Sequence, residues 1–250
     1  MESCGLMIMK LSEDQIHTLL VDSEKQVCKT DECCVQLVAI ANLPSRFGEF
    51  QICGFVSPCD GKEHTAVIKG DPVGKSSVLT RIHSECLTGD VMGSKRCDCR
   101  DQLLESLKKI EKEGTGVLLY LRQEGRNIGL TEKIKAYSLQ DHGYDTVDAN
   151  IHLGYKPDER DYGIAANILR NLRIKSIRLL TNNPEKIQQL TNAGIQIDER
   201  VPLIIEPSEY NRAYLETKAA KSGHLLGDLA TTRDIEEIRE MAQHMHHEEE

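Results

Sequence analysis

The chain has 250 residues, of which 39% are hydrophobic, and a formal net charge of −9. This composition is enough to bury a core in one large domain or two small ones, and it excludes a disordered or fibrous protein. The acidic charge, with three phenylalanines and no tryptophan, argues against a nucleic-acid-binding module, which needs a basic surface and aromatic rings for base stacking.

The sequence shows no membrane or export signal. Its longest apolar stretches, such as residues 116–121, are too short to cross a bilayer, and the first ten residues lack a basic start followed by a sustained apolar run. We therefore expect a cytoplasmic protein without membrane association. Nine cysteines could suggest disulfides, but cytoplasmic thiols stay reduced and tend towards metal binding or catalysis, and the odd count favours the same interpretation.

The first part of the chain reads as an extension followed by strands. Residues 1–34 are polar with scattered cysteines, and we expect an N-terminal extension with one helix around residues 13–21 and no chemistry. Residues 35–82 contain short apolar runs separated by Gly, Pro and Asp, which is typical of strands joined by turns. These runs are residues 35–40, 50–55, 66–68 and 78–82. They predict an antiparallel sheet or a small barrel.

After Cys99 the hydrophobic period changes. Leucine and isoleucine recur at helical spacing between residues 103 and 110, and a strand-like run follows at 117–121. Further helices are expected over 164–172 and 184–193, with a strand at 177–180 and a helix stop at Gly194. This alternation indicates a partly parallel α/β layer. The predicted fold class is therefore mixed α/β (α+β), with an antiparallel β portion packed on an α/β layer.

Three cysteines have a spacing that suggests a metal site. Cys86, Cys97 and Cys99 form the pattern C-x10-C-x-C. Three thiolates without a nearby fourth ligand leave one tetrahedral position of zinc free for water, which zinc would convert to hydroxide. Some zinc deaminases that attack purine or pyrimidine rings use a three-cysteine site in this way. On spacing alone, a closed structural site with a distant fourth ligand, or ordinary buried cysteines, remain alternatives.

The other six cysteines are interpreted as core or incidental thiols. They are Cys4, Cys28, Cys33, Cys34, Cys53 and Cys59.

A basic and polar segment follows directly on the strand predicted at 117–121. Ligands of α/β layers bind beyond the carboxyl ends of strands, which is where residues 122–129, RQEGRNIG, are placed. Arg122 and Arg126 could bind phosphate oxygens bidentately, and Gly125 would let the backbone come close. The alternative is a solvated turn.

Two further segments lie at helix starts. The acidic residues of 158–161, DERD, could simply cap the helix predicted from 164; alternatively, Asp158 handles a proton while Arg160 faces phosphates. Residues 181–184, TNNP, form either a capping turn or a site whose amides bind an anion or a base edge, with Lys186 in the first turn of the helix.

Taken in order, these segments resemble GTP cyclohydrolase II. The resemblance is carried by RIHSECLTGD, CDC, LRQEGRNIGL, GYDTVDAN, DERDYGIAANIL, RLLTNNPEK and GHLL, and it covers residues 43–226. It implies a catalytic domain over 35–227, with a β-rich part at 35–82 and a zinc and α/β part at 83–227. Residues 228–250 are then a charged, helical C-terminal tail, in which His244, His246 and His247 form a weak metal site or nothing.

The resemblance also implies roles for single residues. It assigns the zinc to Cys86, Cys97 and Cys99, in agreement with their spacing. The GTP contacts that it implies are Arg81, Ile82, His83, Ser84, Glu85, Gln102, Glu124, Gly125, Arg126, Thr146, Thr181 and Lys186.

Three catalytic positions follow from the same resemblance. Asp158 matches a proton acceptor, Arg160 matches a proposed nucleophile or phosphate-binding arginine, and Tyr137 matches a tyrosine tied to completing the hydrolysis. An arginine that is always protonated is a poor nucleophile, so we expect Arg160 to stabilise charge. Arg100 departs from the pattern, because many relatives have glycine there.

The implied reaction is zinc-dependent hydrolysis of GTP to 2,5-diamino-6-ribosylamino-4(3H)-pyrimidinone 5′-phosphate, formate and pyrophosphate, the first step of riboflavin biosynthesis. Magnesium on the triphosphate is implied as well. The family resemblance further implies a homodimer, and the short extension leads us to expect a monofunctional chain. The alternatives are a relative that stops at the formylated intermediate, or a catalytically silent GTP-binding protein.

Overall fold

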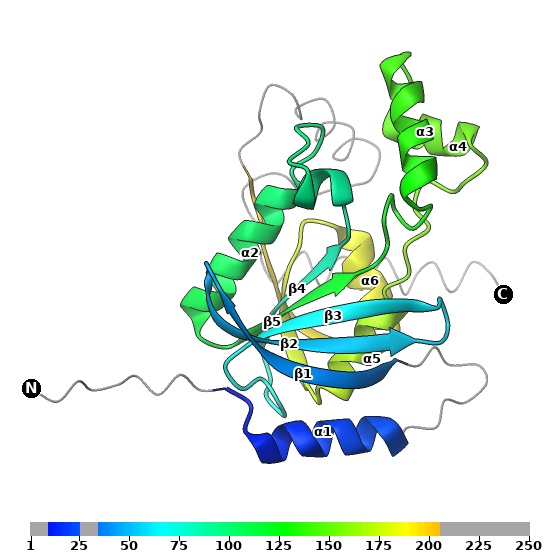
Figure 1. Ribbon diagram of the computed structural model, residues 1–250. Helices are drawn as coiled ribbons and strands as arrows, with labels where there is room; N and C mark the ends of the chain where they lie inside the picture. Colours follow the sequence, from blue (N-terminus) through cyan, green and yellow to red (C-terminus); the bar gives the residue numbers. More distant parts are fainter. Residues whose placement is uncertain (1–9, 26–34, 206–250) are drawn as a thin grey trace, which may run out of the picture.

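The computed structural model describes residues 10–25 and 35–205, and it centres on one seven-stranded sheet with strand order β1-β2-β3-β5-β4-β6-β7 (Figure 1). The strands are β1 Gln36–Ser45, β2 Gly48–Ser57, β3 Lys62–Lys69, β4 Val78–Ser84, β5 Gly116–Leu121, β6 Ser176–Leu180 and β7 Gln196–Val201. The pairs β1–β2, β2–β3 and β3–β5 are antiparallel, whereas β5, β4, β6 and β7 are parallel. The mixed α/β class predicted from the sequence is confirmed.

Strand β4 lies in a different place from the one predicted. The sequence pattern grouped residues 78–82 with the preceding antiparallel strands, but β4 lies between β5 and β6 and runs parallel to both. Residues 78–83 are all buried, although Thr80, Arg81 and His83 are polar, and burial on both faces leaves no pattern that reveals the direction of the neighbouring strands. The antiparallel strands therefore join the α/β layer edge to edge through β3 and β5, and they do not close into a barrel.

Six α-helices and one short π-helical turn surround the sheet in the described part of the chain. They are α1 Glu13–Lys25, η1 Leu87–Val91, α2 Cys99–Glu113, α3 Leu130–Asp141, α4 Thr146–His152, α5 Gly163–Asn171 and α6 Pro184–Asn192. The expected helices of the main domain correspond to α2, α5 and α6. The helix expected in the N-terminal extension is α1, which lies beside β1 and buries Leu19 in the main core (Figure 1).

Strand β5 shows how the core is divided. Val117, Leu119 and Leu121 belong to the cluster that includes the buried faces of α5 and α6. Leu118, between them, belongs to the second cluster, which includes Ile110 of α2. Successive side chains of a strand point to opposite faces, so helices cover both sides of the sheet. The ends of β4, β5 and β6 are thereby fixed relative to one another.

Helices α3 and α4 were not predicted. They pack on each other and project beyond the sheet edge (Figure 1). The buried residues of α3 are Lys133 and Ala136, and those of α4 are Ala149 and Asn150, so no stripe of large apolar residues marks either helix. These helices form one wall of the cavity described below.

Several predictions fall outside the described residues. These are the first nine residues and residues 26–34 of the extension, the tail 228–250 with its three histidines, the GHLL segment, and the thiols of Cys4, Cys28, Cys33 and Cys34. In the described ranges, no helix combines the length and apolar character needed to cross a membrane.

Candidate active site

A cavity of about 270 Å³ opens where the parallel strands end. The segments that follow β4, β5 and β6 all contribute to its lining, because the carboxyl ends of parallel strands meet at one sheet edge. Of the site residues proposed from the sequence, all but Ile82 line it. The Ile82 side chain is fully buried in the core, and its backbone carbonyl accepts a hydrogen bond from Lys186 Nζ at 2.8 Å. Arg122 also lies outside the cavity and pairs with Glu85.

The three cysteines of the C-x10-C-x-C pattern converge in the cavity. Their Sγ atoms all lie within 4.8 Å of one another, and those of Cys86 and Cys97 are 3.7 Å apart. Two thiolates bound to one tetrahedral zinc at about 2.3 Å would be separated by about 3.8 Å. In the described ranges, no further His, Cys, Asp or Glu joins this group. The geometry therefore fits a zinc ion held by three thiolates.

Gly89 in the π-helical turn makes this convergence possible. A Cβ atom at this position would lie 2.8 Å from Cys97 Sγ and 3.1 Å from Cys86 Sγ. A contact of 2.8 Å is essentially never seen for a Cβ atom and one of 3.1 Å is tight, so a side chain at this position would have to displace the sulfurs. The backbone of η1 thus forms a cradle around the thiols.

Asp90 fixes the turn that carries Cys86. Its carboxylate accepts hydrogen bonds from the Cys86 amide at 3.0 Å and from the Tyr120 hydroxyl at 2.9 Å. It also accepts one from Nε2 of His83 at 3.1 Å. Burial lowers the pKa of His83, although Asp90 opposes this, so the imidazole stays neutral and donates from Nε2. The end of β4 is therefore tied to the metal-binding turn.

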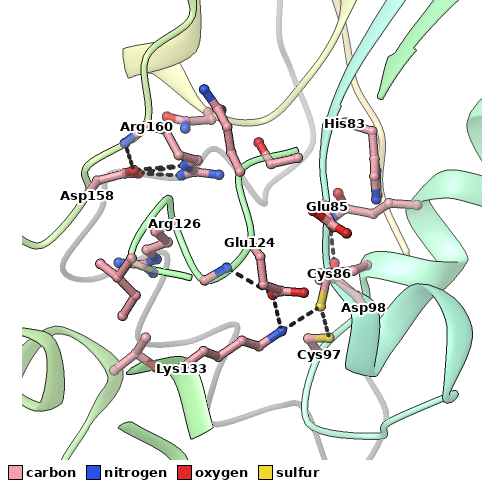
Figure 2. A pocket seen from close by; sticks show the side chains of 18 of the residues that line it. His83, Glu85, Cys86, Cys97, Asp98, Glu124, Arg126, Lys133, Asp158 and Arg160 are labelled. Atoms are coloured by element: carbon pink, nitrogen blue, oxygen red, sulfur yellow. Dashed lines mark hydrogen bonds and ion pairs between the residues drawn. The ribbon is translucent and has the colours of Figure 1, made fainter. Parts of the chain in front are cut away.

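Glu124 and Lys133 form a buried ion pair beside the thiols (Figure 2). Lys133 Nζ lies 2.7 Å from Glu124 Oε1 and 3.2 Å from Cys86 Sγ. Hydrogen bonds from Cys97 and Cys99, and then the charge of Lys133, lower the pKa of the Cys86 thiol, as a metal-binding thiolate requires. Burial would lower the pKa of Lys133, but Glu124 and the Cys86 thiolate outweigh it and raise this pKa, so the ammonium stays charged.

Tyr137 of α3 faces the π-helical turn. Its hydroxyl is 3.2 Å from Thr88 Oγ1, which in turn lies 3.8 Å from Cys86 Sγ. The guanidinium of Arg96 stacks over the ring, 4.9 Å from its centroid. Burial raises the pKa of Tyr137, so its hydroxyl keeps its proton at neutral pH. A protonated donor therefore stands beside the thiol cluster.

Asp158 and Arg160 lie on the side of the cavity opposite the thiols, as Figure 2 shows. Arg160 Nε is 2.8 Å from Asp158 Oδ1, and the two side chains form an ion pair. Burial would raise the pKa of Asp158, but the hydrogen bonds and charge of Arg160 outweigh it and lower this pKa. The N-cap of the following helix is Tyr162, which makes no side-chain capping hydrogen bond, and the preceding Asp161 accepts at Oδ1 from the amide of Gly163, the first helical residue, at 2.7 Å. The acidic segment thus serves the helix through Asp161, whereas Asp158 faces Arg160.

The loop after β5 aims Arg126 into the cavity. Gly125, Arg126 and Asn127 all have positive φ, at 63°, 58° and 74°. For residues other than glycine this conformation costs about 1 kcal/mol or more each, so the surrounding structure must hold it. The Arg126 guanidinium donates to the Pro157 carbonyl at 2.8 Å, and the Arg126 carbonyl accepts from the Glu159 amide at 3.2 Å. The strained loop is thereby clamped to the segment that carries Asp158.

Lys186 occupies the first turn of α6, as predicted. Asn183 caps this helix and accepts from the Glu185 amide at 3.0 Å, so the TNNP segment is a capping turn that also lines the cavity. The Thr181 hydroxyl accepts from the Asn183 amide at 3.1 Å. The Lys186 ammonium lies 5.1 Å from the centroid of the Tyr162 ring.

Arg81 is a second deeply buried cation of the cavity wall. It donates to the Leu180 carbonyl at 2.8 Å and to Gln102 Oε1 at 2.6 Å. Burial lowers the pKa of Arg81 to about 10, which leaves it charged at neutral pH. Arg81 thereby fixes the orientation of the Gln102 amide. Thr146 lies at the start of α4, where its hydroxyl accepts from Gln140 at 3.3 Å.

The sequence analysis did not identify several residues of the site. Lys133, Arg96 and Asn150 line the cavity, and Gly89 and Asp90 shape the thiol cluster. For Lys133 the sequence holds no local signal, since α3 has no stripe of large apolar residues that would mark this position as buried. Its partners, Glu124 and Cys86, come from other segments, which local spacing does not bring together.

Comparison with known proteins gives one consistent family. The profile of a family described as GTP cyclohydrolase II matches residues 36–202. The chain is 56% identical over 194 residues to GTP cyclohydrolase-2 of Buchnera aphidicola subsp. Acyrthosiphon pisum, covering 78% of this chain and 100% of that protein. It is 55% identical over 194 residues to GTP cyclohydrolase-2 of Klebsiella pneumoniae subsp. pneumoniae, covering 78% of this chain and 97% of that protein.

A longer relative matches as well. The chain is 58% identical over 185 residues to the riboflavin biosynthesis protein RibBA of Bacillus subtilis, covering 74% of this chain and 46% of that protein. The chain therefore spans less than half the length of this relative. The family profile nevertheless matches more than half of the chain, and the two GTP cyclohydrolase-2 relatives are covered almost completely. The chain belongs to the GTP cyclohydrolase II family.

Proposed function

We propose that the protein hydrolyses GTP to 2,5-diamino-6-ribosylamino-4(3H)-pyrimidinone 5′-phosphate, formate and pyrophosphate, the entry step of riboflavin biosynthesis. One observation carries the proposal: a cluster of three thiols and a set of cations line the same cavity from opposite sides. A zinc ion at the thiols would supply activated water for attack on the purine ring. The cations would bind the triphosphate of the same substrate.

Three cations of the cavity bond to protein oxygens that the phosphates of GTP could replace. Arg126 and Lys186 donate to the carbonyls of Pro157 and Ile82, and Arg160 pairs with Asp158. Phosphate oxygens accept stronger, charge-assisted hydrogen bonds than carbonyls do, so GTP would take over these donors. When phosphates draw Arg160 away, the pKa of Asp158 would rise from its lowered value, and the carboxylate would become a better proton acceptor.

Tyr137 supports complete hydrolysis in preference to a stop at the formylated intermediate. Its protonated hydroxyl lies on the thiol side of the cavity, beside Thr88. A hydroxyl in this position could donate a hydrogen bond to the second leaving group at the same carbon. Tyr137→Phe is therefore expected to accumulate the formylated product, which mass spectrometry distinguishes by the extra formyl mass. A product mixture unchanged from that of the wild-type protein would remove this role.

The direct test incubates zinc-loaded protein with GTP and magnesium. We expect one formate and one pyrophosphate for each molecule of the diaminopyrimidine product. Mass spectrometry detects that product. GTP binding without any product would instead favour a catalytically silent GTP-binding protein. ATP is the matched control substrate, because it has the same triphosphate and a different base.

The wider biochemical setting is proposed from the family resemblance. We propose that zinc is bound once per subunit, that magnesium accompanies the triphosphate, and that the protein is a cytoplasmic homodimer without nucleic-acid or membrane partners. Metal analysis, sedimentation equilibrium and cell fractionation test these points separately. A monomer that is fully active at all concentrations would contradict the dimer without affecting the proposed reaction.

A further inference from the structure

Lys133 lies beside the thiol cluster, and the proposed reaction leaves its role open. Lys133 comes from α3, lines the cavity and is only 9% exposed. Its ammonium group contacts the Cys86 sulfur at 3.2 Å and the Glu124 carboxylate at 2.7 Å. Burying an ammonium group is costly unless charged groups compensate it. The Cys86 sulfur and the Glu124 carboxylate therefore compensate the cost of burying this ammonium group.

We infer that Lys133 is a positioning residue of the metal centre, which holds the Cys86 thiolate by an N–H···S hydrogen bond and strengthens metal binding through its charge. The inference rests on the proposed function for the identity of the metal and deepens it by assigning this lysine. Lys133 acts through Cys86 and not on the substrate.

Charge balance supports this assignment. Three thiolates around a divalent ion carry a formal net charge of −1, which a largely buried site must offset with a nearby cation. Lys133 places a cation at Cys86, and its charge is shared between the Cys86 sulfur and the Glu124 carboxylate. Arg81 also interacts with Cys99, but its stronger electrostatic partner is Asp98. Lys133 is therefore a cation in direct hydrogen-bond contact with a sulfur of the cluster.

Glu124 locks Lys133 in this position. Its Oε2 accepts from the Leu87 amide at 2.6 Å, and its Oε1 accepts from the Gly125 amide at 2.9 Å in addition to Lys133. One carboxylate thus joins the residue after Cys86, the loop after β5 and helix α3. Residues that orient metal ligands through hydrogen bonds typically contribute about ten- to a hundredfold in metal affinity.

A competing role is conceivable on the same geometry. An ammonium group has three N–H donors, and the contacts to Cys86 and Glu124 use two of them. The third could contact GTP, because Lys133 lines the cavity. In that case, removal of the ammonium would weaken GTP binding and leave metal binding unchanged. The experiment must therefore measure the two affinities separately.

The test compares Lys133→Met, which keeps the length and removes the charge, with Lys133→Arg, which keeps the charge. The matched control is Lys135→Met on the same helix, whose side chain is 58% exposed and pairs with Glu132. Zinc affinity is measured by competition with a chromophoric chelator. The thiolate-to-metal absorption band of the cobalt-substituted protein is recorded for each variant, and neither measurement needs GTP.

We expect Lys133→Met to bind zinc about ten- to a hundredfold more weakly and to shift the cobalt absorption band. Lys133→Arg should recover part of the affinity, and Lys135→Met should match the wild-type protein. If Lys133→Met fails to fold, Lys133→Gln replaces it in the comparison with Lys133→Arg, because both are polar and differ in charge.

Two results would overturn the inference. One is a zinc affinity and cobalt spectrum unchanged in the neutral variants. The other is a raised KM for GTP with unchanged metal affinity, which would make Lys133 a substrate ligand. If the wild-type protein releases no formate while the neutral variants still lose zinc affinity, the proposed function fails and the role of Lys133 stands.

Discussion

The two sides of the cavity are built in different ways. On the thiol side, Cys86 and the turn that follows it are held by Asp90, Glu124 and Lys133 through contacts that a bound metal would leave in place. On the cation side, Arg126, Arg160 and Lys186 are satisfied by carbonyls and by Asp158, which phosphates would replace. The difference fits the proposed function, with a lasting metal site on one side and exchangeable phosphate contacts on the other.

The largest expected effect comes from removing a thiol. Cys97→Ser should lose zinc and lower kcat by about a thousandfold, since a catalytic metal supplies several kcal/mol of transition-state stabilisation. Zinc content and formate release are measured on the same sample. Cys59→Ser, an exposed cysteine outside the cavity, is the control and should behave like the wild-type protein. Normal turnover by Cys97→Ser would contradict the metal mechanism.

The next effect tests the cation side. Arg160→Met should lower kcat/KM for GTP by about a hundredfold, because one charged donor to the developing phosphate charge is lost. Zinc content should stay at the wild-type level, which would separate the two sides experimentally. Arg170→Met, on the outer surface of α5, is the control. Loss of zinc in Arg160→Met would show that the two sides are not independent.

A smaller effect tests the backbone cradle. Gly89→Ala should weaken zinc binding by about tenfold, because its Cβ would lie 2.8 Å from Cys97 Sγ and push the sulfurs apart. Gly54→Ala is the matched control, since the nearest atom to its Cβ would be a Val38 methyl at an ordinary 3.6 Å. Zinc competition titrations of both variants decide the point. Equal affinities would mean that the turn relaxes without cost.

The smallest effect concerns thiol reactivity and pH. Burial raises the pKa of Cys53 to about 12, so at pH 8 only about one molecule in 10,000 carries the reactive thiolate there. Alkylation of Cys53 should therefore be slow and speed up about tenfold per pH unit as the pH rises towards this pKa. Peptide mapping should show Cys86 and Cys97 protected only while zinc is bound. Rapid alkylation of Cys53 at pH 8 would contradict its burial.

The sequence predicted the parts of the fold that have strong periodicity. Helices α2, α5 and α6 were expected because their leucines and isoleucines recur at helical spacing. Strand β7 was missed because Gln196–Val201 has only Ile197 and Arg200 buried, which gives no apolar run. The placement of β4 between β5 and β6 depends on long-range pairing, and a run of buried residues does not specify its partners.

The site was predictable where function depends on local motifs. Cys97 and Cys99 share one short segment, and Lys186 follows its capping turn, so spacing suggested a ligand site, with a structural site and a simple capping turn as alternatives. Gly89 and Lys133 were not predicted, because their roles depend on contacts with other segments of the sequence. The left-handed backbone at Arg126 was equally hidden, since arginine does not favour a positive φ, whereas asparagine, as at Asn127, is enriched there.

The most direct test of the central claim is a zinc titration of metal-free protein with GTP and magnesium present, following formate release. The account predicts no formate without zinc and a linear rise that saturates at one zinc per chain, with Cys86, Cys97 and Cys99 becoming protected from alkylation over the same range. Formate release at the full rate from metal-free protein, or a rise unrelated to protection of these thiols, would contradict it.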